Sequence, residues 1–247
     1  MTDRISYAVD GNVARITLDD GKVNAMSLPF FEALGAALDR AEREKPGAVV
    51  ITGRPGYFSA GLDLKLMPTL APDELQRMLL SFGRTMLRVF TFPIPTVAAL
   101  SGHAIAGGAM LAFACDLRYA ADGAFRLHLN EVAIGLTLPT WAMIVAQSAV
   151  PHRWHTEAIL HARPYLPADA LERSLVTAVV PPERLLDEAS AAAARLCALH
   201  QAAYAGSKAR LRAMVVEWAL AQLEREVRSG AARSWAPCPR SSGSSAP

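Results

Sequence analysis

Apolar and polar residues alternate in the first segments of the chain, and the pattern then changes to a helical spacing. Residues 4–9 and 13–18 alternate on either side of Asp10-Gly11-Asn12, which has the composition of a tight turn, so we predict a β-hairpin. Ser27 is a residue type that favours the start of a helix as its N-cap. The helix predicted after it has one apolar face, which consists of Phe30, Leu34, Leu38 and Ala41.

Two later units share one pattern, in which an apolar strand is followed by small residues and then by helix-compatible sequence. The first unit is the strand 48–53 with the turn Phe58-Ser59-Ala60-Gly61-Leu62-Asp63, and the second is the strand 96–100 with a turn over 101–109. We expect both turns to leave backbone N–H groups free at a helix N-terminus, where partial positive charge collects. The helices of these units are predicted at 73–90 and 107–115.

The remainder of the chain continues to alternate between strand-like and helical patterns, which indicates an α/β fold. The predicted elements are a strand at 116–120, helices at 141–150, 152–162 and 169–173, a strand at 175–180, and continuous helix from 183 to 228. Residues 229–247 have no periodicity and few apolar residues, so we expect a flexible tail. We place the core over 1–188 and a C-terminal helical region over 189–228.

The composition indicates a folded protein with a large apolar core. The chain has 247 residues, of which 52% are hydrophobic and 19% charged, and its formal net charge is +2. So small a net charge does not suggest a nucleic-acid partner. Basic residues gather only near the C-terminus, where a solvated helix face is favoured over contact with an acidic ligand. These residues are Lys208, Arg210 and Arg212.

Neither a membrane segment nor a signal peptide is predicted. The apolar runs are interrupted by Gly, Pro or a charge well before the roughly 20 residues of a membrane span. Met1 leads almost directly into the strand-like segment 5–9, without the basic and apolar regions of a signal peptide. Cys115, Cys197 and Cys238 lack metal-ligand spacing, so we expect no metal site and no disulfide framework. We expect a cytoplasmic protein.

One carboxylate, Glu131, lies in the otherwise apolar segment that follows the second turn. Two turns that aim N–H groups at one point would form an oxyanion hole, and a single acid/base beside it could move a proton next to a thioester carbonyl. Burial among Val132, Ile134 and Leu136 is expected to raise the pKa of Glu131. The simpler interpretation is a surface glutamate that follows two tight turns.

Other polar residues are better explained by structural roles. For Asp63 the role of a helix N-cap is favoured over that of a ligand contact. Asp116 follows a predicted buried helix, so a structural role is favoured for it. His103 and His128 lack a paired nucleophile, and the G-x-S-x-G context of a nucleophilic serine is absent around Ser59. We therefore expect none of these side chains to perform the chemistry.

Three blocks of sequence, taken together, resemble the crotonase superfamily, the enoyl-CoA hydratase/isomerase family. They are Phe58-Ser59-Ala60-Gly61-Leu62-Asp63, the segment 102–116, and Leu129-Asn130-Glu131 with the Gly135, Pro139 and Trp141 that follow. The third block is similar to the single-glutamate Δ3,Δ2-enoyl-CoA isomerases. The resemblance implies an α/β spiral of β-β-α turns, a C-terminal helical region that mediates oligomerisation as a homo-trimer or hexamer, and an acyl-CoA thioester substrate. Coenzyme A is part of that substrate, and no separate cofactor is implied.

The resemblance also implies roles for individual residues. The backbone N–H groups of Ala60 and Gly107 would polarise the thioester carbonyl, and Glu131 would be the single acid/base. The CoA moiety would lie along Ala25 and the loop Ala60, Gly61, Leu62 and Asp63, with Lys22 as a phosphate contact. Trp141 is expected to contact the substrate. The spacing of Met67, Met78, Phe82 and Trp141 fits either the lining of an acyl pocket or a position in the core.

Two departures from the family pattern affect the predicted function. Hydratases of the family use a second glutamate, and Met110 occupies its position here; a thioether cannot accept a proton as a carboxylate does. We therefore expect an isomerase that shifts a 3-enoyl-CoA double bond to 2-trans-enoyl-CoA. Enoyl-CoA hydratase activity and a catalytically weak acyl-CoA-binding role remain alternatives. The second departure follows Lys208, where a Pro/Ser-rich tail is expected to replace the helix that closes the acyl pocket.

Overall fold

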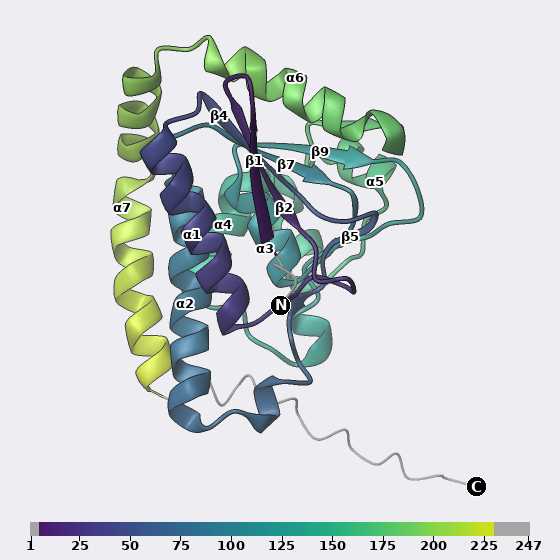
Figure 1. Cartoon of the computed structure of the whole chain (residues 1–247). Helices are drawn as coiled ribbons and strands as arrows, with labels where there is room; N and C mark the ends of the chain where they lie inside the picture. The colour runs from purple at the N-terminus through teal and green to yellow at the C-terminus, as the bar shows by residue number, and fades with distance from the viewer. Residues whose placement is uncertain (1–4, 230–247) are drawn as a thin grey trace, which may run out of the picture.

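A six-stranded sheet forms the centre of the computed structural model, which describes residues 5–229 (Figure 1). Its first two strands form the antiparallel hairpin predicted from the alternating pattern, and the other neighbours are parallel. The strands, in spatial order, are β1 (Ile5–Asp10), β2 (Val13–Leu18), β4 (Ala48–Thr52), β7 (Thr96–Leu100), β9 (Leu117–Ala121) and β11 (Ala178–Val180).

Both faces of this sheet are buried at the central strands β4 and β7, which explains why these two strands are almost continuously apolar, whereas β1 and β2 alternate. In β4, Val49 and Ile51 point into the main core, whereas Val50 points to the opposite face. That opposite face is covered by α6 (Leu185–Cys197), which crosses the sheet in Figure 1 and packs Leu185 and its alanines against the strands.

A smaller parallel sheet supports the spiral. It contains β5 (Gly56–Ser59), β8 (Gly102–Ile105) and β10 (Leu127–His128), with β8 in the middle. Each of these strands follows a strand of the large sheet and precedes a helix. The helices are α2 (Pro72–Phe90), α3 (Gly107–Ala114) and α4 (Thr140–Ala149). The three strand–strand–helix repeats are the β-β-α turns of the expected crotonase fold.

The remaining elements are short, apart from α1 and α7. A two-stranded parallel sheet pairs β3 (Ala25–Met26) with β6 (Gly61–Leu62). The long helices are α1 (Leu28–Glu44) and α7 (Gln201–Arg228), and α7 lies beside α2 and α4 (Figure 1). The others are η1 (Met67–Thr69), η2 (Val132–Ile134), η3 (His152–Trp154), the π-helix η4 (Thr156–Leu160), α5 (Pro167–Glu172) and η5 (Pro182–Arg184).

Three element predictions are corrected by the structure. The helix predicted over 152–162 is a 3₁₀ turn followed by a π-helix, and the strand predicted from 175 begins at Ala178. The turn at 58–63 does not open a helix directly, because Gly61–Leu62 pairs as a strand and α2 begins only at Pro72. Its N–H groups therefore belong to a strand edge and not to a helix N-terminus.

The C-terminal region also differs from the prediction. The helix expected from 183 to 228 is divided at residues 198–200, where the Nδ1 of His200 accepts the N–H of Ala203 (3.2 Å) and caps α7. The boundary expected between 188 and 189 falls inside α6. Beyond Lys208 the helix continues to Arg228, so helix occupies the stretch where we expected a tail to begin. The tail predicted at 229–247 lies outside the described residues, apart from Ser229.

A buried ion cluster attaches α7 to the core. The carboxylate of Asp116 lies 2.7 Å from Nζ of Lys208 and 3.1 Å from a guanidinium nitrogen of Arg212, and it accepts the N–H and hydroxyl of Thr96. Lys208 and Arg212 therefore pair with a carboxylate of the chain itself, and they neither form a solvated helix face nor contact an acidic ligand. Arg210, by contrast, is exposed to solvent. The structural role expected for Asp116 is confirmed.

No helix within residues 5–229 is long and apolar enough to cross a membrane.

Candidate active site

The predicted site residues meet at one edge of the small parallel sheet. Because β5, β8 and β10 run parallel and side by side, their carboxyl ends lie at the same edge. Ala60 follows β5, Gly107 follows β8, and Glu131 comes three residues after β10. Crevices at the carboxyl ends of parallel strands commonly bind ligands in α/β proteins.

A cavity of about 40 Å³ opens at this edge. Glu131 is the only ionisable residue on its wall among the residues that the structure describes. The wall consists of Ala60, Leu62, Leu64, Phe82, Ala106, Gly107, Asn130, Glu131, Ile134 and Leu136. One carboxylate in an apolar recess of this kind is suited to general acid/base chemistry.

Gly107 presents a free backbone donor to the cavity. It is the first residue of α3, and the first intrahelical hydrogen bond of that helix runs from the N–H of Met110 to the carbonyl of Ala106 (2.9 Å). Within residues 5–229 the N–H of Gly107 donates to no other residue. Ala106 has a positive φ of 50° and donates its own N–H to the carbonyl of His128 (2.8 Å). This hydrogen bond fixes the direction in which α3 begins.

The second expected donor, Ala60, is not free. Its N–H donates to the carbonyl of Val23 (3.0 Å), which corrects the role implied for it. The N–H of Asp63 donates to the carbonyl of Met26 (2.9 Å), on the β3 side. Successive N–H groups of an extended strand point to opposite sides, so the N–H of Leu62 points away from β3, along the free edge of β6. Leu62 is therefore the donor that the first loop offers.

Glu131 is buried beside these donors. Its side chain is 7% exposed, and its Oε2 has no hydrogen-bond partner in the described part of the chain. Burial raises the pKa of Glu131 to about 7, in the expected direction. Ile134 and Leu136 lie on the same cavity wall, but Val132 is 42% exposed and does not contribute to that burial as expected. The neighbouring Asn130 also carries a buried, unpartnered side-chain oxygen.

The residues expected to line an acyl pocket divide into two groups. Phe82 lies on the cavity wall, whereas Met67, Met78 and Trp141 are buried in the core and do not line the cavity. Trp141 packs behind Phe82, with 4.7 Å between the ring centroids, so the direct substrate contact expected of it is not borne out. Met110 is also buried in the core and lies off the wall.

The segment expected along the CoA moiety is held by a carboxylate that the sequence analysis did not single out. The side chain of Asp20 accepts the backbone N–H groups of Lys22 (2.7 Å), Asn24 (2.9 Å) and Ala25 (3.2 Å). The side chain of Lys22 is exposed, and Ala25 pairs with Gly61 in the β3–β6 ladder. This arrangement brings the segment next to the first loop.

Asp63 has the capping role that was favoured for it. Its Oδ1 accepts the N–H groups of Lys65 (3.0 Å) and Leu66 (3.1 Å) and thereby closes the turn that leads to η1. The carboxylate thus stabilises the loop that carries Leu62. We find no observation that directs it toward a ligand.

The histidines and Ser59 have structural partners, as expected. Nδ1 of His103 accepts the N–H of Arg126 (3.2 Å), and Nε2 of His128 lies 2.6 Å from the carbonyl of Ala162. The hydroxyl of Ser59 donates to the carbonyl of Asn24 (2.7 Å). No group of three or more His, Cys, Asp or Glu side chains within residues 5–229 is arranged to hold a metal ion.

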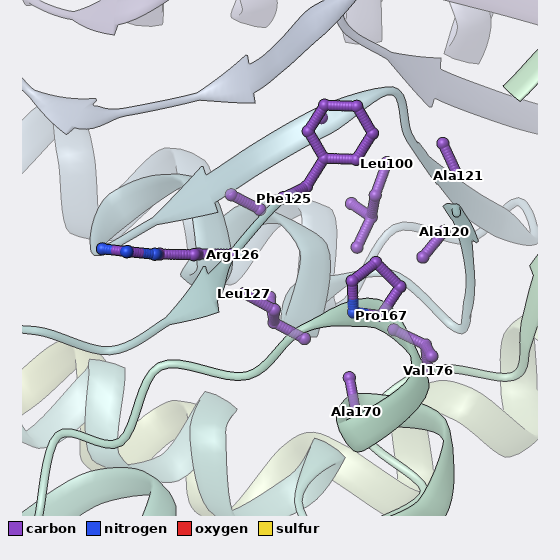
Figure 2. Close-up of a pocket in the computed structure, with 11 residues that line it drawn as sticks. Leu100, Ala120, Ala121, Phe125, Arg126, Leu127, Pro167, Ala170 and Val176 are labelled. Atoms are coloured by element: carbon purple, nitrogen blue, oxygen red, sulfur yellow. The ribbon is translucent and has the colours of Figure 1, made fainter. Parts of the chain in front are cut away.

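A second cavity lies beneath α5 and is too small for a substrate. Its volume is about 10 Å³, which is room for about one water molecule. Figure 2 shows Leu100, Phe125, Pro167 and Val176 around it, with the side chain of Arg126 pointing away from the others. The cavity at Glu131 is the candidate site because the buried carboxylate of Glu131 and the start of α3 at Gly107 meet there.

Sequence reasoning missed Leu64, which directly follows the recognised turn at 58–63. It named Asn130, Ile134 and Leu136 but did not assign them to a cavity wall. Proximity to Leu62 and Glu131 was the available signal, but hydrophobicity alone does not distinguish a cavity wall from core.

Comparison with known proteins identifies one family. The model of the enoyl-CoA hydratase/isomerase family matches residues 8–231. Human mitochondrial enoyl-CoA delta isomerase 1 is 30% identical over 220 residues, which cover 88% of this chain and 73% of that protein. The crystal structure of human mitochondrial Δ3-Δ2-enoyl-CoA isomerase superposes with a TM-score of 0.89 at 29% identity, covering 94% of this chain and 92% of that one.

Hydratases are similar to the chain as well. The structure of an enoyl-CoA hydratase from Mycobacterium ulcerans superposes with a TM-score of 0.86 at 33% identity, covering 92% of this chain and 98% of that one. These relatives have the same fold, but their names describe two reactions, so similarity alone does not select one. The chain belongs to the enoyl-CoA hydratase/isomerase family of the crotonase superfamily.

Proposed function

We propose that the protein is an enoyl-CoA isomerase that converts a 3-enoyl-CoA thioester to the 2-trans-enoyl-CoA thioester. The observation that carries this proposal is that Glu131 is the only ionisable group on the cavity wall within residues 5–229. Hydration uses water activation and protonation by two carboxylates in the family's hydratases. Double-bond migration needs only one base that removes a proton and returns it elsewhere.

In this mechanism Glu131 removes a proton from C2 of the substrate. The electrons form a dienolate, whose negative charge collects on the thioester oxygen. Protonated Glu131 then delivers the proton to C4, which places the double bond between C2 and C3. A pKa near 7 suits both steps, because neither the ionised nor the protonated carboxyl group is strongly disfavoured at neutral pH.

Two backbone N–H groups would stabilise the dienolate. We assign this role to Gly107, at the start of α3, and to Leu62, on the free edge of β6. Oxyanion-hole donors of this kind each contribute about 10²–10³-fold in rate. They cost no reorganisation during the reaction, because the helix start and the β3–β6 ladder already fix them.

The CoA moiety would lie along the edge formed by Ala25 and the 60–63 loop, and Lys22 would contact its phosphates. This assignment is supported by the β3–β6 ladder, which joins Ala25 to Gly61 beside the cavity. It is also supported by the exposure of Lys22, because an exposed lysine can reach a phosphate in solvent. Coenzyme A enters as part of the substrate, and no separate cofactor takes part.

We further propose that the protein assembles as a homo-trimer or hexamer through α7. An apolar stripe on this helix, Leu211, Met214, Val215 and Trp218, faces solvent in the single chain, and Met214 is 83% exposed. Contiguous exposed apolar side chains commonly mark a protein–protein contact. The family's use of C-terminal helices in its trimers favours a second copy of the chain as the partner.

Enoyl-CoA hydratase activity is the second candidate function. It is favoured by the similarity to the Mycobacterium ulcerans hydratase over 92% of this chain. In that case Glu131 alone would have to activate water, since Met110 supplies no carboxylate.

A spectrophotometric assay separates the two candidates. The purified protein is mixed with 3-butenoyl-CoA and, separately, with 2-trans-butenoyl-CoA, and the absorbance of the conjugated 2-enoyl thioester is followed. We expect this band to grow from the 3-enoyl substrate and to persist with the 2-enoyl substrate. Rapid loss of the band from the 2-enoyl substrate would establish a hydratase, and no change with either substrate would refute both candidates.

A further inference from the structure

Phe82 is an almost fully buried residue on the wall of the cavity at Glu131. Its ring lies close to the start of α3, because a methyl group added to Gly107 would come within 3.0 Å of the Phe82 Cζ. The side chain is 4% exposed and contributes to the cavity wall. Leu64 on the same wall is 51% exposed. We therefore infer that the cavity opens at Leu64 and ends at Phe82, so that an acyl chain with its carbonyl at Gly107 would end against this ring.

Other aromatic rings hold Phe82 in place. The ring stacks on Phe31, with 5.4 Å between centroids and an interplanar angle of 25°, and meets Trp141 edge-on at 4.7 Å and 83°. Both partners are almost fully buried. Interiors are close-packed, so a buried ring with neighbours on two sides cannot swing aside without displacing them.

The C-terminal helix closes this aromatic cluster from behind. A methyl group added to Gly83 would lie 2.7 Å from Leu223 of α7 and 3.1 Å from Nε1 of Trp141. Near the end of α7, Glu226 accepts the N–H of Thr140 (3.1 Å) and also its hydroxyl. These contacts hold the first turn of α4, and hence Trp141, so the end of the cavity is rigid.

The volume of the cavity limits what it can accept. A volume of about 40 Å³ accommodates about three water-sized groups. A thioester carbonyl at Gly107 leaves room for a short alkyl chain before the Phe82 ring. We propose that the site selects short acyl groups of about four carbons and that Phe82 sets this limit. The inference rests on the proposed function only in taking an acyl-CoA thioester as the ligand.

Binding of saturated acyl-CoA thioesters tests the length limit without any turnover. Isothermal titration calorimetry would give Kd for acetyl-, butyryl-, hexanoyl- and octanoyl-CoA. Burial of one methylene strengthens binding by about fourfold. We expect affinity to rise by about fourfold per methylene up to butyryl-CoA and not to rise further. A steady rise through octanoyl-CoA in the natural protein would overturn the proposal.

Two substitutions test whether Phe82 sets the limit. In Phe82→Ala, affinity should continue to rise to hexanoyl-CoA and beyond, and Phe82→Leu, which retains more of the core packing, should show a smaller change in the same direction. A limit unchanged in both variants would overturn the role of Phe82. Phe92→Ala is the matched control, because Phe92 is equally buried but lies off the cavity wall; it should lose stability and keep the four-carbon limit.

The binding experiment tests the length limit independently of the proposed isomerase activity. Saturated thioesters have no double bond to move, so a four-carbon limit can be found in a protein without isomerase activity. Conversely, isomerase activity combined with uniform affinity across chain lengths would leave the proposed function standing and overturn only the length limit.

Discussion

The backbone of Gly61 lies directly against the amide nitrogen of Gly107. A methyl group added to Gly61 would be 2.8 Å from that nitrogen and 2.8 Å from the carbonyl oxygen of Ile105. Gly61 also has a φ of +83°, which is strained for residues other than glycine. The spacing of the two proposed oxyanion donors, Leu62 and Gly107, therefore depends on the absence of a side chain at Gly61.

Gly61→Ala should lower kcat/KM for a 3-enoyl-CoA substrate by about 100-fold, the effect of losing one oxyanion donor. Gly56→Ala is the matched control, because its φ is +86° but an added methyl group has no neighbour within 4 Å. Circular dichroism would verify that both variants fold. An equal loss of activity in the two variants would mean that backbone strain, and not the contact with Gly107, determines the effect.

The activity should depend on pH through Glu131. The base must be ionised to remove the C2 proton, and burial raises its pKa to about 7. We expect kcat/KM to be level above about pH 8 and to fall by about tenfold per pH unit below pH 7. The measurement is a pH–rate profile between pH 5 and 9 on protein shown to remain folded. A profile that is level down to pH 5 would contradict a raised pKa in the free enzyme.

The sequence predicted the parts of the site that depend on local pattern. The sequence pattern placed Glu131 in an otherwise apolar segment and Gly107 at the start of a helix, and the structure brings both to one cavity. The hairpin, the strands β4 and β7, and the helices α1 and α2 follow from periodicity for the same reason.

The sequence could not reveal features that depend on distant partners. The N–H of Ala60 is lost to the carbonyl of Val23, and only the β3–β6 pairing shows that Leu62 takes its place. Phe82 and Trp141 are both aromatic residues on the buried faces of helices, and tertiary packing alone decides that Phe82 faces the cavity. The division of the last helix at 198–200 has no Gly or Pro to mark it.

The attachment of α7 should depend on Asp116. Asp116→Asn leaves the buried cation of Lys208 without its counter-charge, which should cost about 3–5 kcal/mol of unfolding free energy. Glu224→Gln is the control, because its ion pair with Arg84 is exposed and should contribute less than about 1 kcal/mol. Chemical denaturation would give both values. A loss below about 1 kcal/mol in Asp116→Asn would show that packing alone holds α7.

The apolar stripe on α7 should control assembly. Met214→Glu places a charge in the centre of the stripe and should convert the proposed homo-trimer or hexamer to monomers. Ala213→Glu, at an exposed position on another side of the same helix, should leave the assembly intact. Light scattering coupled to size-exclusion chromatography would give the masses. An unchanged mass in Met214→Glu would exclude the stripe as the contact.

If Glu131 is the single acid/base of the reaction, the substitution Glu131→Gln should remove the activity and leave the fold intact. The variant should fold, because the amide keeps the shape of the side chain. It should in fact be more stable than the natural protein at pH 8, by up to about 3 kcal/mol. Burial raises the pKa of Glu131 from 4.5 to about 7, so the folded chain loses stability as the pH rises from about 4.5 to about 7. The difference from Glu131→Gln should therefore be complete above pH 7 and disappear below about pH 4.

The measurement is the rate of 2-enoyl-CoA formation from 3-butenoyl-CoA by the natural protein and by Glu131→Gln, together with Kd for butyryl-CoA. We expect the substitution to lower kcat by at least about 10³-fold and to change Kd by less than about threefold. A variant that retains a tenth or more of the natural rate would contradict the account, because another group would then be moving the proton.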